Sequence, residues 1–142
     1  MTALLLATTT YKIMLLLHVL SAVVVFGVGF AQPMVARTSP DSGAAFAKFG
    51  TYVQAPALLV LVGAGTAMLA VAKNDTGVEY MKQAWVSVAF AAWLVAAVAV
   101  FLAVRAYRKA ANAAPFVGIM HLALVVGLWA MIFQPGLDAV VK

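Results

Sequence analysis

The chain has 142 residues, of which 66% are hydrophobic and only 9% are charged. Soluble domains carry about 25% charged residues, and a soluble fold of this size cannot hide so much apolar surface. Cysteine is absent from the sequence, which excludes disulfides, thiolate metal sites and iron–sulfur clusters. We therefore expect one integral membrane domain that spans residues 1–142.

Four apolar runs follow one another along the chain, and each is about as long as a helix that crosses 30 Å of hydrocarbon. They cover residues 11–32, 52–72, 84–104 and 116–133. Because the first run is longer than the apolar part of a signal peptide, we expect it to be a retained helix. Short connections predict an all-α, up-down-up-down antiparallel four-helix bundle.

Turn-forming residues separate the predicted helices. Pro33 follows the first run, and Ser39 to Ser42 reads as a helix start that makes residues 43–50 a helical extension at the membrane interface. The cluster from Asn74 to Gly77 predicts a turn between the second and third helices. Pro115 suits the first turn of the fourth helix, and Pro135-Gly136 ends it.

Basic residues in the short loops indicate the orientation. Loops 33–51 and 105–115 hold Arg37, Lys48, Arg105, Arg108 and Lys109. The other end holds Lys12, Lys73, Lys82 and Lys142, together with Asp75, Glu79 and Asp138. This distribution predicts a multi-pass protein of the plasma (cytoplasmic) membrane, with both loops in the cytoplasm and both termini outside. The net charge of +5 therefore indicates contact with lipid headgroups and no nucleic-acid partner.

Small residues occur at helical spacing and predict helix–helix contacts, since helices in lipid associate by close packing. On the third helix they are Ala89, Ala92, Ala96, Ala99, Ala103 and Ala106. On the other helices they are Gly27, Gly29, Gly63, Gly65, Gly118 and Gly127. The alternative interpretation is that the glycines make room for a flat cofactor. If the alanine stripe faces outward, it would also be a seam for docking to a partner.

Away from the ends of the predicted spans, the ionisable residues are two histidines, His18 and His121. The spans contain no Asp or Glu, which argues against carboxylate-coupled transport and against acid–base catalysis. Each histidine is a candidate haem or copper ligand, and equally a candidate for an interhelical hydrogen bond. Their positions place them about 11 Å apart in depth, which disfavours one haem held by both. A single axial histidine at His18, or two separate sites with His121 in the second, fits more easily.

The residues from Tyr11 to Pro33, with His18 and the run Phe26 to Phe30, resemble the first helix of small four-helix bacterial membrane proteins. The stretch Trp129 to Gly136 resembles their closing helix. The chain is most similar to an uncharacterised family of this kind. It is also similar in pattern to copper-resistance D-type membrane domains and to membrane-bound, haem-containing protoporphyrinogen oxidases. The resemblance implies a four-helix membrane fold and, through His18, haem b binding.

The chain also departs from the pattern of the oxidases. Val25 and Met34 stand where that family has a Trp and a basic residue, and Gln134 precedes the final proline in place of a Lys. The loss of these polar groups argues against oxidase activity.

The sequence therefore favours a non-enzymatic membrane protein, an accessory subunit of a larger complex, of which a redox complex is one candidate. Its expected contacts are the lipid bilayer and a protein partner or further copies of itself. One alternative is a haem- or copper-binding redox protein with His18 as axial ligand, including a divergent protoporphyrinogen oxidase. A small transporter is a third.

Overall fold

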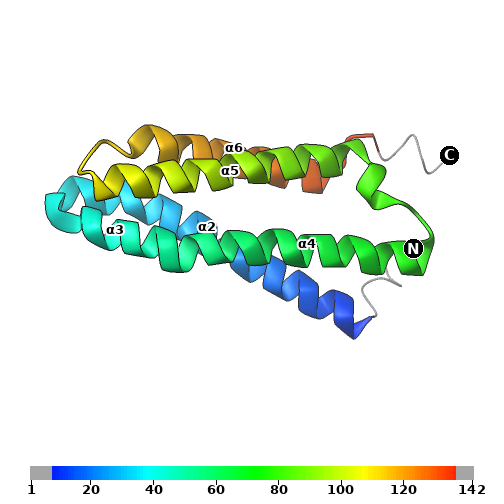
Figure 1. Cartoon of the computed structure of the whole chain (residues 1–142). Helices are drawn as coiled ribbons and strands as arrows, with labels where there is room; N and C mark the ends of the chain where they lie inside the picture. Colours follow the sequence, from blue (N-terminus) through cyan, green and yellow to red (C-terminus); the bar gives the residue numbers. More distant parts are fainter. Residues whose placement is uncertain (1–7, 137–142) are drawn as a thin grey trace.

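The computed structural model describes residues 8–136, and this part of the chain is an all-α four-helix bundle (Figure 1). The long helices are α2 (Thr9–Thr38), α4 (Ala55–Thr76), α5 (Ala84–Arg108) and α6 (Ala114–Phe133). Helix α3 (Gly43–Phe49) and a π-helical turn η2 (Gly50–Gln54) lead into α4, while the short 3-10 turns η1 (Pro40–Ser42) and η3 (Tyr80–Lys82) lie in two connections. The predicted fold class is confirmed.

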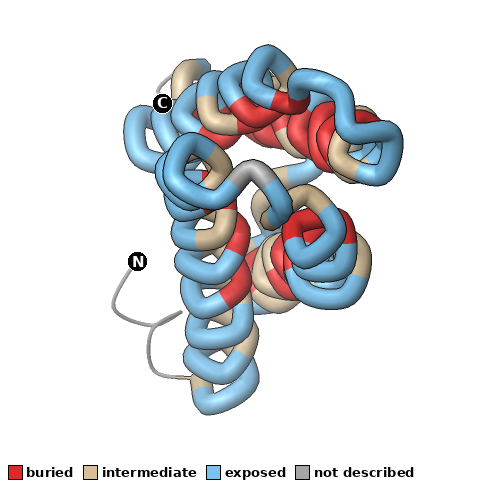
Figure 2. The backbone as a smooth tube through the Cα atoms, turned by 90° about the vertical axis from the view of Figure 1, so that its left-hand side faces the viewer, coloured by how far each residue is buried: buried red, intermediate tan, exposed pale blue. Residues whose placement is uncertain are grey.

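The bundle consists of two antiparallel helix pairs. Helix α2 packs mainly on α4, and α5 packs mainly on α6. Burial is confined to the surfaces between the helices, and their outer faces are exposed (Figure 2). The buried residues of α2 lie between Ser21 and Gln32, so the first third of this helix diverges from the α5–α6 pair, as Figure 1 shows.

Two helices run past the turns that the sequence predicts. Helix α2 continues through Pro33 to Thr38. An interior proline removes one backbone hydrogen bond, but the helix can continue past it when contacts with neighbouring residues stabilise it. Helix α4 continues through Asn74 and Asp75 to Thr76. It ends at Gly77, which has a left-handed φ of 72° and donates its N–H to the Lys73 carbonyl at 2.8 Å.

The extension predicted at residues 43–50 is helical, but it continues the axis of α4 (Figure 1). Together the segment Gly43–Thr76 forms one span of 34 residues. At 1.5 Å per residue it is about 51 Å long, well above the roughly 30 Å of a hydrocarbon core. Helix α6, with 20 residues, matches that thickness. We therefore place α3 largely at headgroup level.

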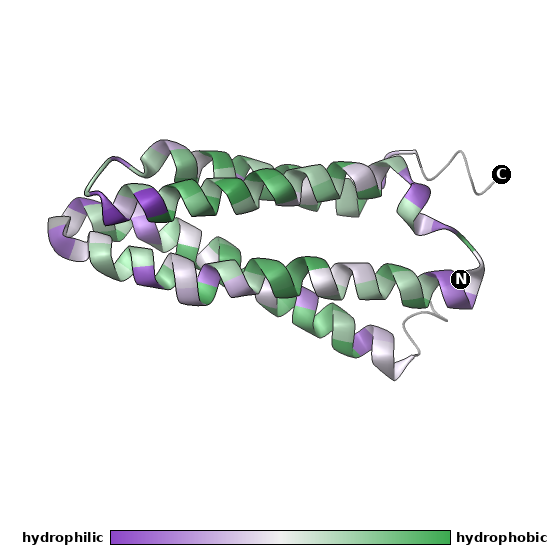
Figure 3. Ribbon diagram, viewed as in Figure 1, coloured by the Kyte–Doolittle hydropathy of each residue, from purple (hydrophilic) through white to green (hydrophobic). Residues whose placement is uncertain are grey.

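Polar residues gather at the two ends of the bundle and apolar residues fill its middle (Figure 3). In the described part of the chain, four helices are long and apolar enough to cross a membrane, and the chain is a multi-pass membrane protein. The end formed by α3, the end of α5 and the start of α6 carries the basic residues of loops 33–51 and 105–115. Asp138 and Lys142, which the charge count assigns to the opposite end, lie outside the described residues.

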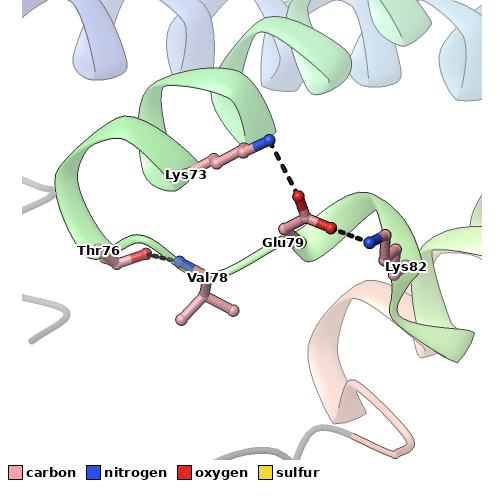
Figure 4. Close-up of polar contacts among 5 residues, drawn as sticks. All are labelled: Lys73, Thr76, Val78, Glu79 and Lys82. Atoms are coloured by element: carbon pink, nitrogen blue, oxygen red, sulfur yellow. Dashed lines mark hydrogen bonds and ion pairs between the residues drawn. The ribbon is translucent and has the colours of Figure 1, made fainter.

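The connection between α4 and α5 is held by ion pairs around Glu79 (Figure 4). Its carboxylate accepts hydrogen bonds from the ammonium groups of Lys82 and Lys73, the second at 3.2 Å. These bonds, with Lys82 the stronger partner, hold the pKa of the Glu79 carboxyl below its ordinary value. The Thr76 hydroxyl accepts a hydrogen bond from the Val78 N–H at 3.2 Å, which also stabilises the geometry of this turn.

Candidate functional site

His18 lies on α2 and binds the backbone of α4. Its Nδ1–H donates to the carbonyl oxygen of Leu61 at 2.8 Å. Gly65, one turn further along α4, makes room for the ring, since a Cβ there would lie 3.1 Å from the His18 Cε1 atom. This hydrogen bond requires a proton on Nδ1, so in the neutral ring Nε2 carries the free lone pair. His18 is thus an interhelical hydrogen-bond donor whose second nitrogen retains the capacity to bind a metal.

Gln54 joins three helices at the point where the π-helical turn meets α4. Its side chain is 2% exposed, and its Nε2 donates to the Val25 carbonyl of α2 at 3.2 Å. The same nitrogen lies 3.1 Å from the Met120 sulfur of α6. A π-helical turn shifts the register of the residues around it, and here it turns an amide into the bundle. The sequence offered one signal for this contact, an uncharged amide inside a predicted span.

Trp93 of α5 provides the third interhelical hydrogen bond. Its Nε1–H donates to the Leu58 carbonyl of α4 at 2.9 Å. Leu58 and Leu61 lie one turn apart, so α4 accepts a side-chain donor from α5 and another from α2 within a single turn. The sequence signal for this contact is the tryptophan itself, because a buried indole N–H usually finds an acceptor.

His121 of α6 differs from these groups because its Nε2 atom is buried and has no hydrogen-bond partner among the described residues. Its ring lies 4.3 Å from the Phe30 ring and interacts with the backbone of Val117, one turn back along α6. Gly29 of α2 makes this approach geometrically feasible, because a Cβ at that position would lie 2.9 Å from the His121 Nε2. The imidazole ring is therefore closely packed between α2 and α6, in apolar surroundings.

The structure does not bring the two histidines together. His18 lies against Leu61 and Gly65, whereas His121 lies against Gly29 and Phe30. On α2, His18 and Gly29 are eleven residues apart, which is about 16 Å along a helix axis. Within residues 8–136 no group of three His, Asp or Glu side chains could hold a metal ion. The two rings therefore lie at different depths, which disfavours a single group held by both.

The alanine stripe of α5 faces the interior. Its members are between 0% and 8% exposed: Ala89, Ala92, Ala96, Ala99, Ala103 and Ala106. Gly127 of α6 lies against it, since a Cβ there would be 3.6 Å from the Ala92 Cβ. The stripe is a contact within the bundle, so the interpretation of it as an outward docking seam is wrong.

The glycines divide into two groups. Gly29 and Gly65 lie at close interhelical contacts. Gly27, Gly63 and Gly118 lie on exposed faces, where an added Cβ would meet nothing within 4 Å. The expectation that these three serve packing inside the bundle is therefore wrong. A helical period places Gly27 and Gly29 about 200° apart around α2, so one must face outward when the other faces α6.

The fold and these contacts define the class of protein: a multi-pass all-α bundle whose interior polar groups connect its helices. Comparison with protein-family models, with curated proteins and with solved structures found no match for the chain.

Proposed function

We propose that this chain is a non-catalytic membrane subunit that associates through its lipid-facing helices with the other proteins of a larger membrane complex. The interior supports this function, because the donors of His18, Gln54 and Trp93 are engaged with backbone carbonyls of neighbouring helices. Side chains used in this way hold the bundle together and are not positioned for acid–base or nucleophilic chemistry.

The observation that carries the proposal is the exposure of glycine on three helices. Gly27 of α2, Gly63 of α4 and Gly118 of α6 are exposed on the outer surface, where an added Cβ would meet nothing within 4 Å. Glycine is about 1 kcal/mol less favourable than alanine inside a helix, and packing within this chain gives no reason for it here. Glycine on a lipid-facing surface lets the backbone of another helix approach closely. Helix α5, which has no glycine, is the natural comparison.

The test is gentle detergent extraction from the native membrane followed by native mass spectrometry. We expect the chain to be recovered with a stoichiometric partner, and Gly63→Leu or Gly118→Leu to reduce that recovery at least tenfold. The matched control is Leu94→Ala, an exposed position on α5, which should leave recovery unchanged. A chain recovered only as a monomer, with or without these substitutions, would refute the proposal. If the chain is recovered bound only to further copies of itself, it forms a homo-oligomer and is not a subunit of a larger complex.

A second candidate function is a membrane redox protein with haem b or copper bound through His18. The favouring observation is the hydrogen bond from Nδ1 to the Leu61 carbonyl, which is the arrangement that presents Nε2 as a ligand. The resemblance to copper-resistance D-type domains and haem-containing oxidases supports it too. The donor set fits one axial ligand only, because His121 lies at another depth. When bound, such a group would supply one-electron chemistry, and His18 would hold it in the membrane.

The absorption spectrum of the purified chain separates the two functions. A Soret band that is lost in His18→Ala and retained in His121→Ala would establish the redox protein. If the cells are supplied with both haem and copper and the preparation is still colourless and free of copper, the subunit proposal stands.

We also propose that loops 33–51 and 105–115 lie in the cytoplasm and both termini outside, in the plasma membrane. Among residues 8–136, one end of the bundle holds five basic residues and one acid, whereas the other holds three basic residues and two acids. Because the chain has no cysteine, single cysteines report the orientation directly. A membrane-impermeant maleimide should label Asp75→Cys in intact cells and should label Ala111→Cys only after lysis. The reverse pattern would invert the orientation.

A further inference from the structure

The basic end of the bundle is built by close contact between α3 and the last turns of α5. Gly50 lies against Val104, where a Cβ at position 50 would collide with the valine methyl group. The Phe46 ring packs 5.3 Å from the Tyr107 ring. Gly43, at the start of α3, lies beside the Tyr107 carbonyl. These contacts bring side chains of α3 and α5 side by side.

Two shallow grooves follow from this arrangement. The larger, of about 410 Å³, lies between α3 and α5, and its lining includes Lys48, Tyr52, Tyr107 and Arg108. The smaller, of about 250 Å³, is lined by Phe101, Val104, Arg105 and Arg108. Arg108 lines both grooves, so the two are neighbours at this residue. The Arg108 Nη2 donates to the Thr51 hydroxyl at 3.1 Å, which holds the side chain toward η2.

The lining changes from charged to apolar along α5 toward the middle of the membrane. Arg108 lies at the end of the helix, Arg105 one turn inward, and Phe101 a further turn inward with 65% of its surface exposed. Tyr52, 76% exposed, lies at the same end on η2. A phospholipid has the same order, with phosphate outermost and acyl chains beneath. Tyrosine suits the boundary between them.

We propose that these two grooves form a binding site for the headgroup of an anionic phospholipid, with Lys48, Arg105 and Arg108 contacting phosphate and Phe101 contacting an acyl chain. Basic pockets beside membrane helices bind phosphate headgroups by this combination of charge and position. The acid at this end, Asp41, lines neither groove. Two neighbouring grooves that share Arg108 suit a headgroup with two phosphates, such as diphosphatidylglycerol.

The test is native mass spectrometry of the delipidated full chain, titrated with diphosphatidylglycerol, phosphatidylglycerol or phosphatidylethanolamine of equal acyl composition. We expect both anionic lipids to bind more tightly than the zwitterionic lipid. Lys48→Gln, Arg105→Gln and Arg108→Gln should each weaken binding about fivefold, which corresponds to about 1 kcal/mol. The matched controls are Arg37→Gln and Lys109→Gln, which remove the same charge at the same end without touching a groove. They should change binding less than twofold.

Equal weakening by the control variants would overturn the site, since only the total charge of this end would then matter. Equal binding of the zwitterionic lipid would overturn it as well. Competition by millimolar inorganic phosphate would show that the grooves recognise a soluble phosphate and would refute the lipid. Thr51→Ala removes the hydroxyl that holds Arg108 without removing charge, so it should weaken binding less than Arg108→Gln does. A larger loss than in Arg108→Gln would contradict the role of the Arg108 charge.

Discussion

Replacing Gly29 with alanine should destabilise the bundle, while the same change at Gly27 should not. A methyl group at position 29 would lie 2.9 Å from the His121 Nε2 and would overlap the methyl group of Met120. The Met120 side chain is 2% exposed and its sulfur contacts Gln54, so it has little freedom to move away. Overpacking of this kind typically costs about 1–3 kcal/mol. At position 27 the methyl group meets nothing within 4 Å, and alanine favours the helix by up to about 1 kcal/mol.

The assay is reversible unfolding of the purified chain in mixed detergent micelles, with helix content followed by circular dichroism. The two variants differ by the same methyl group two residues apart on α2, so the difference between them isolates the contact with α6. We expect Gly29→Ala to be less stable than Gly27→Ala by about 1–3 kcal/mol. Equal stabilities would show that α2 and α6 are not packed at Gly29 as described.

Three further outcomes follow from the polar contacts. Trp93→Phe should lower the free energy of unfolding by about 1 kcal/mol, measured in the same micelles, because it removes an interhelical hydrogen bond; no change would mean that water or lipid satisfies the indole equally well. His121→Leu should leave stability unchanged or raise it by about 1 kcal/mol, since the wild-type Nε2 is buried without a partner; a marked loss would reveal a hydrogen bond or ligand at that nitrogen. Glu79→Gln should destabilise the chain at neutral pH and have no effect in acid. The reason is that Lys82 lowers the pKa of the Glu79 carboxyl in the folded state. The stabilisation from this carboxylate is therefore present above the unfolded pKa and is lost as pH falls through the folded pKa. A difference between the two proteins that persists in acid would contradict this ionic role.

The four helices could be predicted from composition and length, because a bilayer requires about 20 apolar residues in every span. Some helix ends were predicted as well, since α5 begins at Ala84 and α6 ends at Phe133, but the ends of α2 and α4 were not. Whether Pro33 ends α2 depends on the tertiary contacts of the residues beyond it, and the sequence around a proline does not contain that information. The same applies to Asn74 and Asp75, where the positive φ of Gly77 decides the end of α4.

The candidate site was predicted less completely than the fold. His18 and His121 could be recognised by their type, and their difference in depth followed from helix direction. The role of Gln54 could not be foreseen, because it depends on a π-helical turn that rotates its side chain inward. The side of its helix on which each glycine lies could not be predicted either. Because apolar residues cover all sides of each helix, no periodicity distinguishes the lipid-facing side from the interior.

The most direct test of the proposed subunit is photo-crosslinking in the native membrane. A benzoylphenylalanine in place of Leu59, an exposed residue one turn from Gly63, should give an adduct with a second protein. The same residue in place of Leu94, exposed on the glycine-free α5, should give none. No protein adduct from either position, in membranes where the full-length chain is intact, would contradict the proposal that the outer surface of α4 binds a partner.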